Sequence, residues 1–126
     1  MGNIFSKLQT RSVQIESNLA AQEYTFVKFS TTTDGVVEQA TDATAPVYIL
    51  NEGYDGTSGA RTGSVIMGGQ AKLKVGGTVA AGDFLTADGS GLGVATTTAN
   101  AKYGATALEA GVANDVVMVQ VVQGNY

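Results

Sequence analysis

The sequence predicts an all-β fold, a compact barrel-like or sandwich-like domain, and three observations predict it. Short runs of β-branched and aromatic residues recur along all 126 residues. Glycine-rich turns, with 17 glycines in the chain, separate these runs. The order of strands and turns also occurs twice, which indicates two pseudo-repeated hairpin units. At this length the chain is expected to be one domain with a modest core.

The first half of the chain predicts four strands and a long loop. Val13 and Ile15 alternate with polar residues, as in a half-buried strand. Asn18 is placed to cap one helical turn. The strands are expected at residues 12–16, 24–30, 36–39 and 47–50, the last opened by Pro46 where a missing N–H is tolerated. A glycine-rich loop follows at residues 51–63.

The second half predicts six more strands. Gly68-Gly69 separates the first two of them, at residues 64–67 and 71–75. Asp88-Gly89 suits a tight turn, because glycine adopts positive φ freely and aspartate tolerates it. The remaining strands are expected at residues 84–87, 92–95, 103–108 and 115–123. The last strand is apolar on both faces and is expected to be central in the sheet.

Two matching anchors indicate the internal repeat. Phe26 corresponds to Phe84 (84 − 26 = 58) and Leu50 to Leu108 (108 − 50 = 58), with an Asp-Gly turn and a Thr/Ala loop between them in each copy. We therefore expect one domain at residues 12–126 with pseudo-repeats at about 12–70 and 71–123. Each half is too small to fold comfortably alone.

Residues 1–11 form a predicted N-terminal arm that carries two basic residues and no acidic one. Two interpretations remain open, a frayed terminus or a segment that orders on a partner. In the second interpretation the contacts to a capsid or a neighbouring subunit come from Ile4, Phe5, Lys7, Leu8 and Arg11.

Composition argues against several functions. Only 14% of residues are charged, against roughly 25% in an average domain, and such a surface favours association with protein. The net charge is −4, so no nucleic-acid partner is expected. The chain has no Cys and no His, which removes thiolate nucleophiles, His-based triads and the usual zinc sites. No apolar run approaches the ~20 residues of a membrane helix, so no membrane partner is expected.

No pattern predicts a reaction centre or a cofactor. The run Gly89–Gly93 lacks the Lys-Ser/Thr of a phosphate-binding loop. Asp55 and Asp88 fit turns better than a metal site. Glu52 and Glu109 are a conceivable carboxylate pair, but Glu52 aligns with Ala110 in the repeat. We expect no enzyme, no cofactor and no metal.

The motif order resembles a known family. The run Val75–Gly89, then Tyr103–Gly111 and Asp115–Val122, is similar to small capsid cement (head decoration) proteins of tailed bacteriophages, and residues 22–123 fit the pattern. The resemblance implies a structural protein of the virion, made in the host cytoplasm. It implies a trimer on the outer capsid surface at capsomer junctions, where it binds the major capsid protein and stabilises the shell.

A different class of function stays open beside this one. A phage fibre, tail or surface module would recognise a host glycan through Tyr48, Tyr54 and the loop at residues 51–63. Glycan binding without affinity for capsids would favour that alternative.

Overall fold

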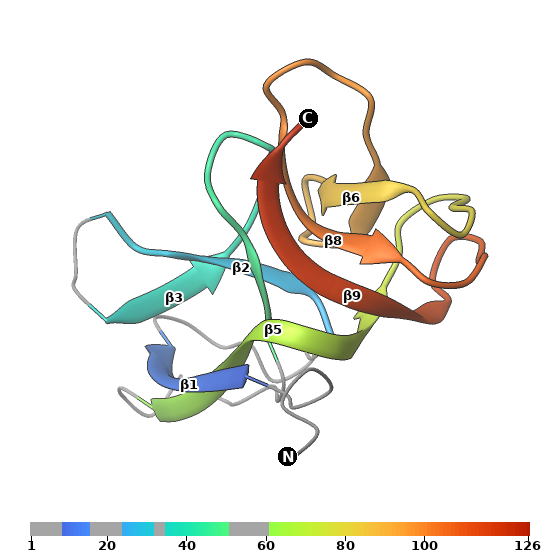
Figure 1. Cartoon of the computed structure of the whole chain (residues 1–126). Helices are drawn as coiled ribbons and strands as arrows, with labels where there is room; N and C mark the ends of the chain where they lie inside the picture. The colour runs from blue at the N-terminus through green and yellow to red at the C-terminus, as the bar shows by residue number, and fades with distance from the viewer. Residues whose placement is uncertain (1–8, 16–23, 32–34, 51–60) are drawn as a thin grey trace, which may run out of the picture.

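The computed structural model describes residues 9–15, 24–31, 35–50 and 61–126, with residues 9–15 and 61–63 described by their backbone alone. These residues form nine strands and no helix, which confirms the all-β prediction (Figure 1). The strands are β1 (Gln9–Ile15), β2 (Phe26–Phe29), β3 (Val36–Gln39), β4 (Tyr48–Leu50), β5 (Arg61–Lys74), β6 (Phe84–Ala87), β7 (Gly93–Ala95), β8 (Lys102–Ala107) and β9 (Val116–Asn125).

The first five strands close into a ring, which we call ring 1. Its order is β1-β3-β2-β4-β5, and β5 pairs back to β1. All pairs are antiparallel except β1–β3, in which Ile15 lies opposite Val37. A closed ring leaves no open sheet edge, which is how small barrels avoid edge-to-edge aggregation.

The later strands form a second ring of the same order, ring 2. The strand β5 pairs with β9, β9 with β8, β8 with β6 and β6 with β7, all antiparallel. A parallel bridge between Val75 and Gly93 joins β7 back to the end of β5. The end of β5 thus corresponds to β1, because each pairs in parallel with the second strand of a hairpin. These two hairpins, β2–β3 in ring 1 and β6–β7 in ring 2, therefore correspond to each other.

The strand β5 belongs to both rings, which corrects the expected break at Gly68-Gly69. It runs unbroken over 14 residues (Figure 1). Its earlier part pairs with β1 and β4, and from Gly69 onward it pairs with β9. Gly69 has a φ of 90°. Glycine accepts this conformation without a steric penalty, so the strand bends there and stays paired. The expected repeat boundary at residues 70/71 therefore falls inside one continuous strand.

The domain also begins earlier than expected. The strand β1 starts at Gln9, not at Ser12, so the backbone of residues 9–11 belongs to the sheet and not to the arm. The expected helical turn at residues 18–23 lies outside the described residues. Within the described part of the chain, no helix is long and apolar enough to cross a membrane.

The β6–β7 hairpin reverses differently from the prediction. Gly91 N–H donates to the Asp88 carbonyl (3.2 Å), and Gly91, not Gly89, has the positive φ (78°). A tight turn that ends in a left-handed residue is a common hairpin loop. The Asp88 carboxylate accepts bonds from the N–H groups of Ser90 (2.7 Å) and Leu92 (3.0 Å), so its predicted turn role is confirmed.

Adjacent residues of the short strands join two separate cores. Successive side chains in a strand point to opposite faces. Phe26, Ile49 and Ile66 join a large cluster that extends into ring 2 and includes Leu73, Leu85 and Val119. Their neighbours in sequence, Val27, Leu50 and Val65, join Val37 in a smaller cluster. This explains why these strands are apolar at consecutive positions.

The predicted central position of the last strand is confirmed, since β9 pairs with β5 on one side and β8 on the other. Only one of its faces is buried, through Val117, Val119 and Val121. On the other face Val116 is 45% exposed and Val122 is 41% exposed. Val116 and Val122 on the outer face of β9 are therefore part of the protein surface, although the strand is central in the sheet.

Candidate functional site: a loop that joins the two rings

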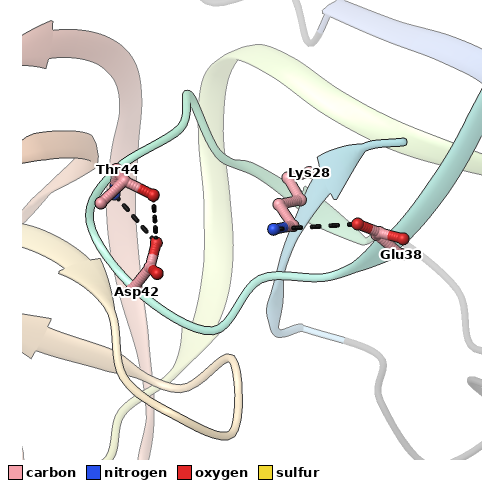
Figure 2. Close-up of polar contacts among 4 residues, drawn as sticks. All are labelled: Lys28, Glu38, Asp42 and Thr44. Atoms are coloured by element: carbon pink, nitrogen blue, oxygen red, sulfur yellow. Dashed lines mark hydrogen bonds and ion pairs between the residues drawn. The ribbon is translucent and has the colours of Figure 1, made fainter. Parts of the chain in front are cut away.

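Residues 40–47 form a loop that leaves β3 of ring 1 and contacts ring 2. Lys102 N–H on β8 donates to the Ala43 carbonyl (2.9 Å). The Gln123 side-chain amide on β9 donates to the Val47 carbonyl (3.2 Å). Figure 2 shows the loop in full, with Asp42 and Thr44 at its outer bend. The loop therefore fixes the two rings against each other by hydrogen bonds.

Thr44 fixes the conformation of this bend. Its N–H (3.0 Å) and its hydroxyl (2.6 Å) both donate to the Asp42 carboxylate (Figure 2). The side-chain bond first, and the backbone bond second, hold the pKa of the Asp42 carboxyl below its ordinary value of 3.8. This is an aspartate turn, whose role is to shape the backbone.

One ion pair lies beside the loop. Lys28 Nζ on β2 is 3.7 Å from a carboxylate oxygen of Glu38 on β3 (Figure 2). Both side chains are partly exposed, so the pair contributes only about 0–1 kcal/mol to stability. The Glu38 carboxylate balances the positive charge of Lys28, so the pair affects only its immediate surroundings.

Two shallow hollows flank Pro46. One is lined by Pro46 with Lys102, Tyr103, Gln123, Gly124 and Asn125 of ring 2. The other is lined by Pro46 with Lys28, Phe29, Thr31, Ala45 and Tyr48 of ring 1. Each measures about 190 Å³, below the roughly 300–1,000 Å³ of ligand pockets that enclose a small molecule. Neither hollow has the size of an enclosed active site.

Two further carboxylates accept backbone hydrogen bonds. Asp83 accepts a bond from Ala80 N–H (2.9 Å), and Glu109 accepts one from Met118 N–H (2.8 Å). Glu52 and Asp55 lie outside the described residues. Among the residues that the structure describes, no group of three or more acidic side chains is placed to hold a metal ion.

The predicted contact residues are mostly beyond the described part of the chain. Ile4, Phe5, Lys7 and Leu8 lie outside it, as does Tyr54. Arg11 lies in β1, where it pairs with Val65 of β5 through the backbone. Tyr48 lines the ring 1 hollow, and its ring contacts Phe29 edge-on, with the centroids 5.5 Å apart.

The sequence does not single out the residues that line the hollows, apart from Tyr48. From the sequence, Pro46 is expected only to open a strand and Tyr103 only to lie within one. Their proximity follows from the contact between residues 43 and 102, which are far apart in sequence. The aromatic residues themselves were the available signal, but their grouping depends on the tertiary fold.

The described residues form an all-β protein of two linked rings that share β5 and are joined by loop 40–47. No protein-family model matches the chain, and no curated protein matches it significantly. Among solved structures the chain is similar to the N base of the head fiber gp8.5 in bacteriophage phi29, with a TM-score of 0.71 and 19% identity. The match covers 95% of this chain and 98% of that chain. At 19% identity, this structural similarity shows that the two chains share a fold.

Proposed function

We propose that this chain is a structural virion protein that decorates the head of a tailed bacteriophage and stabilises its shell. The observation that carries the proposal is the fold shared with the N base of a phage head fiber over nearly the whole of both chains. The motif order that resembles capsid cement proteins supports the same assignment. We propose no catalytic role.

The proposed arrangement is a trimer on the outer head surface at the junctions between capsomers. A protein that binds only the assembled shell stabilises that shell by mass action. The sparse charge, 14% of residues, supports extensive contact with the major capsid protein or with other copies of this chain. The proposed contacts of the N-terminal segment are Ile4, Phe5, Lys7, Leu8 and Arg11, the last of which lies in β1.

The test mixes purified protein with undecorated heads of the parent phage. We expect the protein to co-sediment with heads at saturable stoichiometry and to raise the temperature at which the heads release DNA. Absence of co-sedimentation would overturn the proposal. Sedimentation equilibrium of the free protein tests the trimer, which has three times the 12.8 kDa chain mass.

A truncation tests the contacts of the N-terminal segment. Removing residues 1–8 leaves β1 intact, because that strand begins at Gln9. We expect the truncated protein to keep its fold and to bind heads more weakly than the full chain. Unchanged head binding would show that these residues make no contact with the shell.

A further inference from the structure

The outer face of ring 2 carries exposed aliphatic side chains where β8, β9 and β5 lie side by side (Figure 1). At the end of β8, Leu108 N–H donates to the Met118 carbonyl (3.0 Å), and Met118 lies opposite Lys72 across the β9–β5 pair. Val116 is on the same face as Met118 and lies opposite Lys74. Leu108 is 44% exposed, Val116 is 45% exposed and Met118 is half-buried. We call Leu108, Val116 and Met118 the aliphatic patch.

A polar row borders the aliphatic patch. Thr106, Gln120 and Gln70 lie opposite one another across the same three strands. The Gln120 side-chain amide donates to the Gly69 carbonyl (3.2 Å), which holds it in this row. An apolar centre with a polar border is the usual composition of a protein interface. The aliphatic centre offers neither flat rings nor side-chain hydrogen-bonding groups to a sugar, so the patch fits a protein partner.

The β5 edge of the aliphatic patch is basic. Lys72 is exposed and Lys74 is half-buried, and both lie on the face of the patch. Lys72 Nζ lies 6.0 Å from the centroid of the Tyr24 ring, the outer limit of a cation–π contact. The Asp115 carboxylate accepts a bond from Val112 N–H (3.0 Å) and is not paired with Lys74. Within the described part of the chain, neither lysine forms an ion pair with a carboxylate.

The β8 edge of the aliphatic patch is acidic. Glu109 follows Leu108 and is exposed, and one of its carboxylate oxygens accepts a bond from Met118 N–H (2.8 Å). The Met118 carbonyl accepts from Leu108, so the backbone groups of Met118 point toward β8 and the Glu109 carboxylate lies on that side. Lys72 lies on the β5 side of Met118. The patch therefore has opposite charges at its two edges, about two strand spacings or roughly 10 Å apart.

This charge pattern fits a second copy of the same chain. In a cyclic arrangement of copies, the basic edge of one copy lies against the acidic edge of the next, and the aliphatic patches meet at the centre. An unlike protein would need its own matching pattern, whereas this chain supplies both halves. We propose that the aliphatic patch and its two charged edges form the contact between copies of this chain. The inference rests on the homo-oligomer proposed above and assigns its interface.

Sedimentation equilibrium of the full chain and its variants over a range of concentrations tests this interface. Val116→Asp places a charge in the aliphatic patch, and we expect it to weaken self-association about tenfold or more, because burying an unpaired charge is costly. Val116 is exposed in the single chain, so circular dichroism should show the variant folded. Ala95→Asp is the matched control, since it adds the same charge at an exposed position on β7, outside the patch.

Charge reversal tests the two edges. Lys72→Glu combined with Lys74→Glu should weaken self-association, as should Glu109→Lys, because like charges would then meet. Combining all three substitutions restores opposite signs and is expected to recover self-association. Glu109→Gln keeps an acceptor for Met118 N–H and removes only the charge, so it should weaken self-association less than Glu109→Lys.

Several outcomes would overturn the proposal. A full chain that stays monomeric but co-sediments with heads would remove the interface and leave the structural role standing. Undiminished self-association of Val116→Asp, or no recovery in the triple variant, would place the contact elsewhere. A Val116→Asp variant that self-associates but no longer binds heads would make the patch a contact with the shell. Self-association that Val116→Asp weakens, in a chain that binds no heads, would support this interface and overturn the proposed function instead.

Discussion

Gly104 on β8 of ring 2 lies close to buried residues from the first half of the chain. A Cβ at this position would lie 2.6 Å from a Val47 methyl group, 2.8 Å from the Phe26 ring and 2.9 Å from the Val47 carbonyl oxygen. Val47 and Phe26 are both fully buried. Only glycine fits between a strand of ring 2 and these side chains of ring 1.

We therefore expect Gly104→Ala to destabilise the protein by about 1–3 kcal/mol, the usual cost of overpacking a core. Urea denaturation measures the change. Gly89→Ala is the matched control, because its added Cβ would meet nothing within 4 Å. Equal stability of the two variants would contradict the close approach of the rings at Gly104.

The Asp42–Thr44 turn gives a second prediction at this scale. Because the folded pKa of Asp42 is lowered, the turn contributes stability above the unfolded pKa and loses it as the pH falls through the folded value. The Asp42 carboxylate is fully exposed, so we propose to measure its own pKa by NMR titration and not the stability of the whole protein. We expect a pKa below 3.8 for Asp42 and a return toward that value in Thr44→Ala. A titration unchanged by the substitution would show that Thr44 is not the cause.

Among the strands, β5 connects the two rings. Its earlier part pairs with β1 and β4 of ring 1, and its later part pairs with β9 of ring 2, so one bent strand belongs to both rings. The bend at Gly69 costs little for glycine, but a side chain at a φ of 90° is strained.

We expect Gly69→Ala to reduce stability by about 1 kcal/mol or more, because alanine disfavours positive φ. Thermal unfolding followed by circular dichroism measures the loss. Gly77→Ala provides the comparison, since that glycine has ample space and no positive φ. A Gly69→Ala variant as stable as Gly77→Ala would argue against a strained bend in β5.

At the scale of the whole molecule, the two rings form one folding unit. They share β5, and the larger core contains Phe26 and Ile49 from ring 1 with Leu85 and Val119 from ring 2. Phe26 N–H also donates to the Gly91 carbonyl at the β6–β7 turn (2.7 Å). Unfolding of either ring would therefore disrupt the larger core.

A single cooperative transition is therefore expected in thermal or urea unfolding, as in most small domains. Far-UV circular dichroism and tyrosine fluorescence should give the same midpoint, and Gly104→Ala should shift both midpoints equally. Two separated transitions would mean that the rings fold independently.

The all-β class and the central place of β9 can be predicted from the sequence alone. The places of most strands can be predicted too, as can the correspondence of the hairpins that begin at Phe26 and Phe84. These features depend on local signals, namely alternation of apolar and polar residues, glycine turns and β-branched runs. Such signals lie within a few neighbouring residues and do not depend on the rest of the chain. The 58-residue spacing of Phe26 and Phe84 matches the first residues of β2 and β6.

The way in which the two repeats combine follows from long-range strand pairing and not from local sequence. The strand β5 belongs to both rings because distant strands, β4 and β9, pair with its two parts. The sequence predicts a break at Gly68-Gly69 because glycine also commonly ends strands. The positive φ of Gly91 in place of Gly89 depends on the closing bonds of its loop. The hollow that Pro46 and Tyr103 line depends on the contact of loop 40–47 with β8, because these two residues become neighbours only when the rings are joined. Contacts between residues far apart in sequence leave no periodic pattern in it, and this is the physical reason that the hollow is visible only in the fold.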